Sequence, residues 1–156
     1  MRLEYIGEFV SDSYRSDLLK NLENDILRSI EVTPLEDGFI HPSQKIIFDF
    51  MKKYPIRLIK DWTHTVFSAE YKHFNIAIAV LKLISYYGSA YRLLDGDFIC
   101  ETALKNENLE VREASILTIE SAGKKEFIEK LKNYSEPITY LDSYRKKVIE
   151  QLEKVA

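Results

Sequence analysis

Cysteine, glycine and proline are all scarce in this chain, which has one, five and four of them among its 156 residues. The single cysteine, Cys100, excludes an intramolecular disulfide and a zinc site made of several thiolates. The low glycine and proline content excludes a collagen-like chain, and 46% apolar residues exclude a disordered one. The composition therefore predicts a single α-helical domain over residues 1–156, rich in helix formers and poor in turn formers.

Long apolar runs are also absent. No stretch approaches the roughly 18 uninterrupted apolar residues that a membrane-spanning helix needs. Residues 1–8 carry two acids where a secretion signal has a long apolar run. Because a lone cysteine also suits a reducing compartment, we expect a cytoplasmic protein.

Clustered positive charge is missing as well. The net charge of −3 combines nine acids and four bases in residues 1–37 with 16 acids and 18 bases in residues 38–156. Residues 1–37 thus form an acidic N-terminal segment, whereas lysines gather only in pairs such as Lys124-Lys125. Non-specific nucleic-acid binding requires a clustered basic surface that neutralises many phosphates, so a nucleic-acid partner is not expected.

The three histidines are not spaced as metal ligands. A helical metal site needs two histidines three or four residues apart with an acid nearby, and His41, His64 and His73 do not meet that condition. We expect His64 to form a solvated surface pair with Asp61. His73, beside Phe74, is expected to pack within a buried helix with its polar nitrogen satisfied.

Few other residues in the sequence are candidates for catalysis or for binding a cation. Cys100 lies in an apolar stripe and is expected to be a small buried thiol. The fragment Asp95-Gly96-Asp97 is too short for a calcium site, and Asp97 is better explained as an N-cap or first-turn acid of a helix. The sequence thus predicts no catalytic residue, no metal and no cofactor, and an enzyme stays an open alternative.

Hydrophobic periodicity predicts helices and no strands. Leu18, Leu22 and Ile26 recur at the spacing of one helical face. Pro42 suits the first turn of a second helix, which Pro55 stops. The predicted helices span residues 11–31, 42–54, 56–66, 70–87, 97–105, 109–122, 124–132 and 137–154.

The chain is also similar to itself at an offset of 35 residues. The residues that coincide are Ile76 with Val111, Ala79 with Ala114, Ile84 with Ile119, and Gly88 with Gly123. Both glycines are expected to take a left-handed conformation that ends a helix. A period in this range is typical of stacked helix pairs, which need a capping helix at each end. The acidic helix 11–31 and the charged helix ending at Lys154 are the predicted caps.

Residues 109–131 resemble one HEAT repeat of the phycobilisome-lyase type. The residues that carry the resemblance are Val111 and Arg112 at the start of the second helix, Ala114, Ser115 and Ile119 on its buried side, Gly123 at its end, and Ile128 and Leu131 in the next repeat. Two positions depart from the family pattern, Leu109, where proline is usual, and Glu120, where a small residue is usual. The resemblance implies an all-α fold, a short HEAT-like superhelix of about seven to nine helices with its HEAT-like pairs in residues 55–156.

One edge of such an array gathers candidates for binding. Tyrosine is abundant, with ten copies, and is enriched at binding hot spots; those near the starts of second helices are expected to be exposed. The repeat offsets bring acids and an amide to the same edge, although acids at helix starts are also ordinary dipole partners. The predicted partner-binding residues are Tyr71, Asn75, Glu110, Glu113, Tyr140 and Asp142.

These features predict a non-enzymatic module that binds another, basic protein. Its most specific form is an immunity or inhibitor protein that neutralises a cognate bacterial toxin, for example a nuclease. In overall character the chain resembles the small helical immunity proteins of contact-dependent inhibition systems. The alternatives are a structural or adaptor repeat protein and a nucleic-acid-processing HEAT-like enzyme, which would require a basic concave channel.

Overall fold

The computed structural model describes residues 12–36 and 38–155, and within them the chain forms nine α-helices and no strand. The predicted all-α class is confirmed, and the number of helices lies within the predicted range. The helices are α2 (Asp12–Val32), α3 (Pro42–Lys53), α4 (Ile56–Val66), α5 (Phe74–Tyr86), α6 (Gly88–Leu93), α7 (Gly96–Ala103), α8 (Leu109–Ala122), α9 (Phe127–Asn133) and α10 (Thr139–Lys154).

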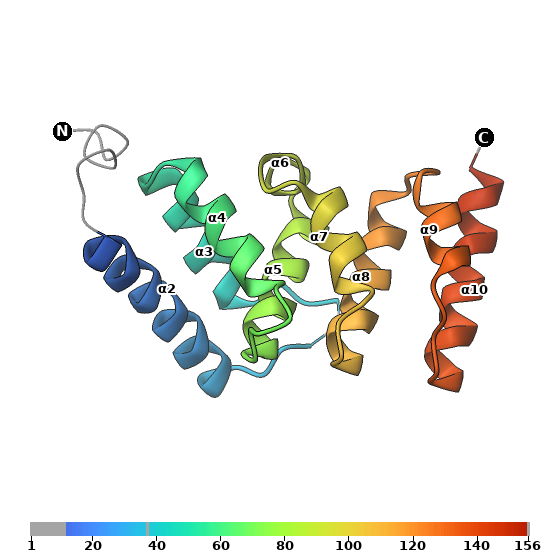
Figure 1. The fold of residues 1–156 in the computed structure, drawn as a ribbon, viewed down its shortest axis with the longest axis horizontal. Coiled ribbons are helices and arrows are strands. Elements are labelled where there is room, and N and C mark those ends of the chain that lie inside the picture. The colour runs from blue at the N-terminus through green and yellow to red at the C-terminus, as the bar shows by residue number, and fades with distance from the viewer. Residues whose placement is uncertain (1–11, 37, 156) are drawn as a thin grey trace.

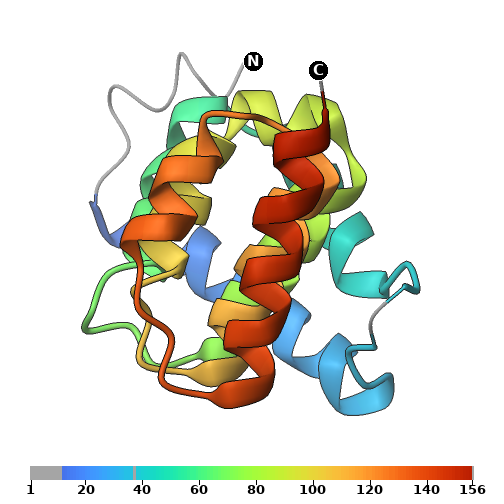
Figure 2. The same ribbon diagram turned by 90° about the vertical axis from the view of Figure 1, so that its right-hand side faces the viewer.

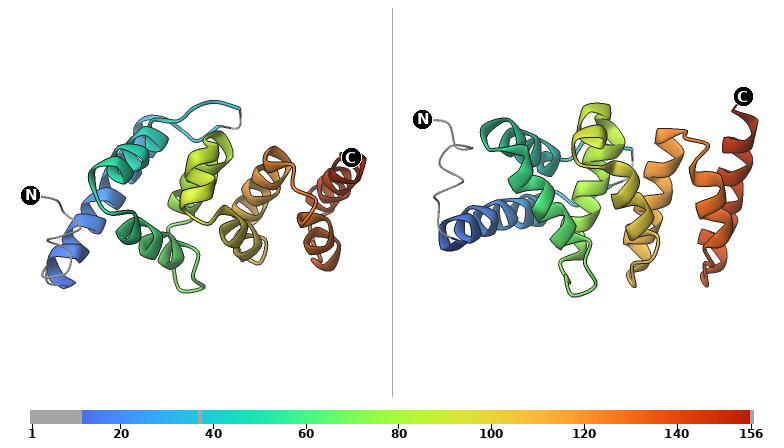
Figure 3. Two further views of the ribbon diagram at one scale, coloured as in Figure 1. Left: turned by 90° about the horizontal axis from the view of Figure 1, so that it is seen from above. Right: turned by 45° about the horizontal axis from the view of Figure 1, so that its top comes forward.

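Most of the helices stand in two rows along the longest axis of the molecule (Figures 1 and 3). One row contains α4, α7 and α9, and the other contains α5, α8 and α10. Viewed from the end of the stack, the two rows lie side by side (Figure 2). Each helix of the first row is followed along the chain by its neighbour in the second, and the short α6 joins α5 to α7. The second row carries the surface described below.

The two ends of the stack are occupied by α2 and α10 (Figure 1). Helix α2 packs against α3 and α5, and Leu22 and Ile26 on its inner face are buried. Helix α10 buries Leu141 and Val148 against its neighbours, while charged side chains cover its outer side. Among the acids of the N-terminal segment, Glu4, Glu8 and Asp37 lie outside the described residues.

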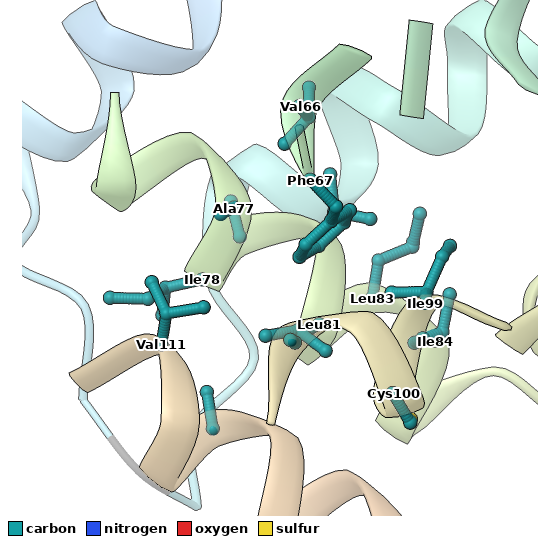
Figure 4. Close-up of a cluster of buried hydrophobic side chains, with 14 of the residues drawn as sticks. Val66, Phe67, Ala77, Ile78, Leu81, Leu83, Ile84, Ile99, Cys100 and Val111 are labelled. Carbon is teal, nitrogen blue, oxygen red and sulfur yellow. The ribbon is translucent and has the colours of Figure 1, made fainter. Parts of the chain in front are cut away.

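The core is centred on α5, whose sequence is apolar almost all round. Residues Ile76 to Leu81 of this helix are all buried, as its composition predicts. Its most extensive partner is α8, the helix related to it by the 35-residue offset, and Val111 and Ile119 of α8 are buried. Side chains from α4, α7 and α8 converge around α5, with Cys100 among them (Figure 4).

The two glycines of the repeat behave differently. Gly123 ends α8 with φ of 63°, in the left-handed region, as predicted. The prediction for Gly88 is wrong, because its φ is not positive and it begins α6. Helix α5 ends at Tyr86, and the following Tyr87 has an extended backbone, so no left-handed residue is needed there.

Helix α5 also begins later than predicted. It starts at Phe74 and not near residue 70, because the preceding turn directs the Tyr71 side chain toward α2. The Tyr71 hydroxyl donates a hydrogen bond to Glu23 at 2.5 Å, a contact between residues 48 apart in sequence. His73 is therefore exposed at the start of α5, and the prediction that it packs within a buried helix is wrong.

A buried ion pair joins α8 to the α9–α10 connection. The Arg112 guanidinium donates to both carboxylate oxygens of Glu136, at 2.8 and 3.2 Å, and to the carbonyls of Asn106 and Glu107, each at 3.0 Å. The Glu136 side chain is fully buried and also accepts the N–H of Ile138. Arg112, singled out by the repeat resemblance, thus has a structural role.

Glu120, one of the two departures from the repeat pattern, has a local explanation. Its carboxylate accepts the Tyr144 hydroxyl of α10 at 2.6 Å, so the long acidic side chain links α8 to the terminal helix. None of the helices in the described part of the chain has the length and apolar character needed to cross a membrane.

Candidate functional site

The exposed face of α5 and α8 is bordered by the connection between α2 and α3, residues 33–36 and 38–41, hereafter the α2–α3 loop. This loop runs along the second row before returning to α3 (Figures 1 and 3). Lys82 of α5 holds it by donating to the carbonyl of Glu36 at 2.6 Å. His41 closes it, since its Nδ1 accepts the N–H of Ser43 at 3.0 Å and its Nε2 lies 2.5 Å from the Thr33 carbonyl oxygen. The loop and the helix face together enclose two adjoining pockets.

The first, here named the acidic pocket, has a volume of about 550 Å³ and lies between α5, α8, the start of α10 and the loop. Apolar side chains of the loop and the helices form part of its wall. Its polar groups come from Lys82 and from four of the six residues predicted to bind a partner. The lining residues are Ile30, Pro34, Leu35, Asn75, Ile78, Lys82, Leu109, Glu110, Glu113, Ala114 and Tyr140.

The two carboxylates of this pocket, Glu110 and Glu113, outnumber its cation Lys82. Within the described residues neither Glu110 nor Glu113 forms an ion pair. Partial desolvation and then the negative charges of Glu113 and Glu110 raise the pKa of Tyr140 above its ordinary value. Tyr140 is 55% exposed, so its ring is available at the mouth of the pocket, while its hydroxyl is hydrogen-bonded to Glu113. The pocket offers carboxylate acceptors beside an exposed aromatic ring.

The second, here named the Gln44 pocket, has a volume of about 320 Å³ and adjoins the first. Gln44 of α3 is 2% exposed, and its Oε1 has no hydrogen-bond partner. Two largely exposed aromatic side chains, Phe39 of the loop and Tyr86 of α5, stand at this pocket, and the hydroxyls of Ser85 and Ser121 are hydrogen-bonded to each other. The lining residues are Gly38, Phe39, Gln44, Ile78, Lys82, Ser85, Tyr86, Ala114, Leu117, Thr118 and Ser121.

The other two predicted binding residues lie apart from these pockets. Tyr71 is only partly exposed, and the bond from its hydroxyl to Glu23 fixes it against α2. Burial, with the neighbouring Glu23 carboxylate, raises its pKa strongly. Asp142 binds Arg145 at 2.7 Å and Lys146 at 3.1 Å, and hydrogen bonds from these two cations hold its pKa below the ordinary value. Asp142 is thus an internal ion-pair partner within the first turn of α10.

Groups that could carry other chemistry are engaged in packing. Cys100 is fully buried, and burial followed by the negative charge of Asp97 raises the pKa of its thiol to about 12. His64 is exposed as predicted, but its ring stacks on Phe98 with centroids 4.6 Å apart, while Asp61 pairs with Arg15. No group of His, Cys, Asp or Glu side chains in the described ranges is arranged to hold a metal ion.

Asp97 lies in the first turn of α7, as predicted from its place in the sequence. Its carboxylate accepts the Tyr91 hydroxyl and the Lys124 ammonium, the latter at 2.9 Å. Burial alone would raise the pKa of Asp97, but these hydrogen bonds and the lysine charge outweigh it and lower the pKa. The cluster ties α6, α7 and the end of α8 together.

Three residues that shape the pockets carry no signal in the sequence. Gln44 and Lys82 lie within helices at positions that suit solvent equally well, and Phe39 lies between glycine and isoleucine in a predicted loop. Their grouping depends on the course of the α2–α3 loop across α5. The pair of apolar residues Phe39 and Ile40 in a predicted loop is the one sequence feature that indicates this site, and both side chains are exposed in the structure.

Comparison with protein-family models, with curated proteins and with solved structures gives no match to this chain. The arrangement of the pockets therefore provides the functional evidence.

Proposed function

We propose that this protein is a non-enzymatic binding module that docks through its acidic pocket on a basic surface of another protein. The observation that carries the proposal is the grouping of Glu110 and Glu113, without ion-pair partners, beside the exposed ring of Tyr140. Carboxylates left unpaired at a surface favour a cationic partner and speed its association, and tyrosine is enriched at binding hot spots. Helix pairs stacked as in a HEAT-like array suit such a role because they present a continuous side surface.

The most specific form of the proposal is an immunity or inhibitor protein of the cytoplasm that neutralises a bacterial toxin. A nuclease is the favoured class of toxin, because its active site is positively charged to hold phosphates. Glu110 and Glu113 would occupy the place of substrate phosphates and so block the active site.

A growth experiment tests this form directly. The open reading frame immediately upstream of the gene is expressed from an inducible promoter, with or without this protein. We expect induction alone to stop growth and co-expression to restore it. Restoration should be lost with Glu110→Lys/Glu113→Lys and retained with Glu129→Lys/Glu150→Lys, a control with the same charge change at two exposed glutamates of α9 and α10.

Two results would contradict the proposal. Growth that is unaffected by the upstream product argues against a toxin partner, and concentration-dependent self-association in its place favours the adaptor alternative. Rescue that survives Glu110→Lys/Glu113→Lys would place the interface elsewhere on the molecule. Tight binding of labelled duplex DNA at physiological salt would revive the nucleic-acid-processing alternative.

A further inference from the structure

The two pockets share part of their lining. Ile78 and Lys82 of α5 and Ala114 of α8 contribute to both the acidic pocket and the Gln44 pocket. The α2–α3 loop contributes Pro34 and Leu35 to one pocket and Gly38 and Phe39 to the other. The two pockets therefore adjoin along the face of α5 and α8.

We propose that they form a single groove for an extended segment of the partner, with a basic side chain in the acidic pocket and an apolar side chain in the Gln44 pocket. This inference rests on the proposed function, because it specifies the chemistry of the segment that the same surface binds. The occupant is a peptide segment of a protein. The groups that line each pocket specify which kind of side chain of the segment binds there.

The hydrogen-bonding groups along the groove match those of an extended peptide. Glu110 and Glu113 accept from a cationic side chain, and arginine fits two neighbouring carboxylates well because its guanidinium presents five donors. Lys82 has three donors and uses one on the Glu36 carbonyl, which leaves others for a carbonyl of the segment. Gln44 offers an amide that is buried and lacks a partner at Oε1.

The unpartnered Oε1 atom of Gln44 is the second, independent observation that points to a ligand. A buried polar atom without a hydrogen bond costs about 1–3 kcal/mol, so such atoms are rare in folded proteins. Here the residue lines a pocket, where rotation of its terminal amide brings either the oxygen or the nitrogen toward a bound chain. An N–H or C=O of an extended segment would satisfy it. A helical segment would not, because its backbone groups are already paired.

The apolar end of the groove is marked by two exposed aromatic rings. Phe39 is 69% exposed and Tyr86 is 57% exposed, and both line the Gln44 pocket together with Ile78. Exposed aromatic side chains beside a pocket are typical of contact hot spots, where an aliphatic side chain is covered on two sides. The pocket volume of about 320 Å³ is at the lower end of the usual range for ligand pockets and suits a single side chain.

Binding of synthetic peptides tests the groove. The probes are fluorescein-labelled decapeptides with blocked ends, on a Gly-Ser background, that contain Arg and Leu separated by one to four residues, Arg alone, Leu alone, or Glu and Leu. Binding to the full chain is followed by fluorescence anisotropy. We expect one Arg–Leu spacing to bind about tenfold more tightly than either single-residue peptide, and the Glu–Leu peptides to bind most weakly.

Two variants separate the ends of the groove. In Glu110→Gln/Glu113→Gln, the Arg of the peptide should no longer increase its affinity, whereas the Leu still should. In Phe39→Ser, the Leu should no longer increase the affinity, whereas the Arg still should. Because all three side chains are at least partly exposed, these changes leave the fold intact. Gln44→Leu should weaken every peptide, and Glu129→Gln/Glu150→Gln serves as the control that changes none.

The proposal is overturned if no Arg–Leu peptide binds more tightly than the peptides with Arg alone or Leu alone. It is also overturned if Glu110→Gln/Glu113→Gln or Phe39→Ser removes the affinity gained from both Arg and Leu. Failure here is distinguishable from failure of the proposed function. A toxin partner whose binding is weakened by Glu110→Lys/Glu113→Lys but unchanged by Phe39→Ser and Gln44→Leu would support the acidic interface and reject the continuous groove. A partner insensitive to all of these variants would reject both.

Discussion

The charges of Arg112 and Glu136 are buried and paired, in contrast to those of the glutamates that line the acidic pocket. The buried pair has hydrogen bonds from the Tyr134 hydroxyl and from the Ile138 N–H, so each charge is compensated inside the fold. Glu110 and Glu113 lie within one helical turn of Arg112 but face the acidic pocket. Arg112 therefore stabilises the structure, while the two glutamates are available to a partner.

Substitution of Glu136 by Gln should lower the free energy of unfolding by about 3 kcal/mol, because the Arg112 guanidinium is then left buried without a counter-charge. Glu129→Gln, at an exposed position, should change it by less than about 0.5 kcal/mol. Urea unfolding at neutral pH measures both. Equal effects of the two substitutions on the free energy of unfolding would show that the buried pair does not stabilise the fold.

The same ion pair predicts a pH dependence. Burial alone would raise the pKa of Glu136, but hydrogen bonds from Arg112, Tyr134 and the Ile138 N–H outweigh it, so the folded pKa lies below the ordinary 4.5. The unfolded chain then binds the proton more readily than the folded chain does. The stabilisation is fully present above the ordinary pKa and is lost as the pH falls through the folded pKa. Unfolding followed from pH 7 downward should show a shallower acid loss in Glu136→Gln.

Cys100 should be inert in the folded protein. Burial raises the pKa of its thiol to about 12, and its exposed fraction is 0%, so neither the thiolate nor access is available at pH 8. Reaction with a disulfide reagent that gives a coloured product should be negligible in buffer and should yield one thiol per chain in urea. Rapid reaction of the folded protein would contradict the packing around α5.

At the level of elements, local signals predicted the helices where they were strong. Pro42 and Pro55 mark the start of α3 and the entry to α4 in the structure, and α8 has the predicted bounds. The start of α5 was misplaced because the turn before it is fixed by the contact between Tyr71 and Glu23, which no local pattern reveals. The short α6 was missed since a six-residue helix has too few residues for periodicity.

Part of the candidate site also follows from the sequence, and part depends on contacts that no local pattern reveals. Asn75, Glu110 and Glu113 lie together on one edge of neighbouring helices related by the 35-residue offset, as periodicity predicts. Tyr71 and Asp142 lie outside this pocket, where they bind Glu23 and Arg145, contacts that the 35-residue offset does not reveal. The Gln44 pocket could not be predicted at all, since it depends on the path of the α2–α3 loop.

The two repeat glycines should respond oppositely to alanine. Gly123→Ala should destabilise the protein by about 1 kcal/mol, because an L residue is strained at φ of 63°. Gly88→Ala should instead stabilise it by about 0.5 kcal/mol, because its φ is not positive and no atom lies within 4 Å of the added methyl. Thermal unfolding of both variants checks this. Losses of equal size would mean that Gly88 also ends a helix in the left-handed conformation.

The contact between Tyr71 and Glu23 predicts how α2 is held. Tyr71→Phe should lower stability by about 1 kcal/mol and increase amide hydrogen exchange in α2 more than in α8. Tyr86→Phe is the matched control, because Tyr86 is exposed and its ring contacts that of Tyr87. Protection of α2 that does not change in Tyr71→Phe would show that apolar packing of Leu22 and Ile26 is sufficient.

At the scale of the whole molecule, the groups that hold the stack together lie apart from the proposed binding face. The first row of helices, the α5 core and the buried ion pair stabilise the stack, while two adjoining pockets lie between the second row and the α2–α3 loop. A net charge of −3 is too small to attract a basic partner over a long range, so in the proposed complex the local grouping of Glu110 and Glu113 would supply the electrostatic attraction.

The most direct test of the central claim is the dissociation constant of the purified complex with the neutralised toxin, measured by calorimetry at two salt concentrations. We expect Glu110→Lys/Glu113→Lys to weaken binding about tenfold or more and to reduce its salt dependence, while Glu129→Lys/Glu150→Lys stays within about twofold of the unchanged protein. Equal weakening by the two charge reversals, or none by either, would contradict the assignment of the acidic pocket as the interface.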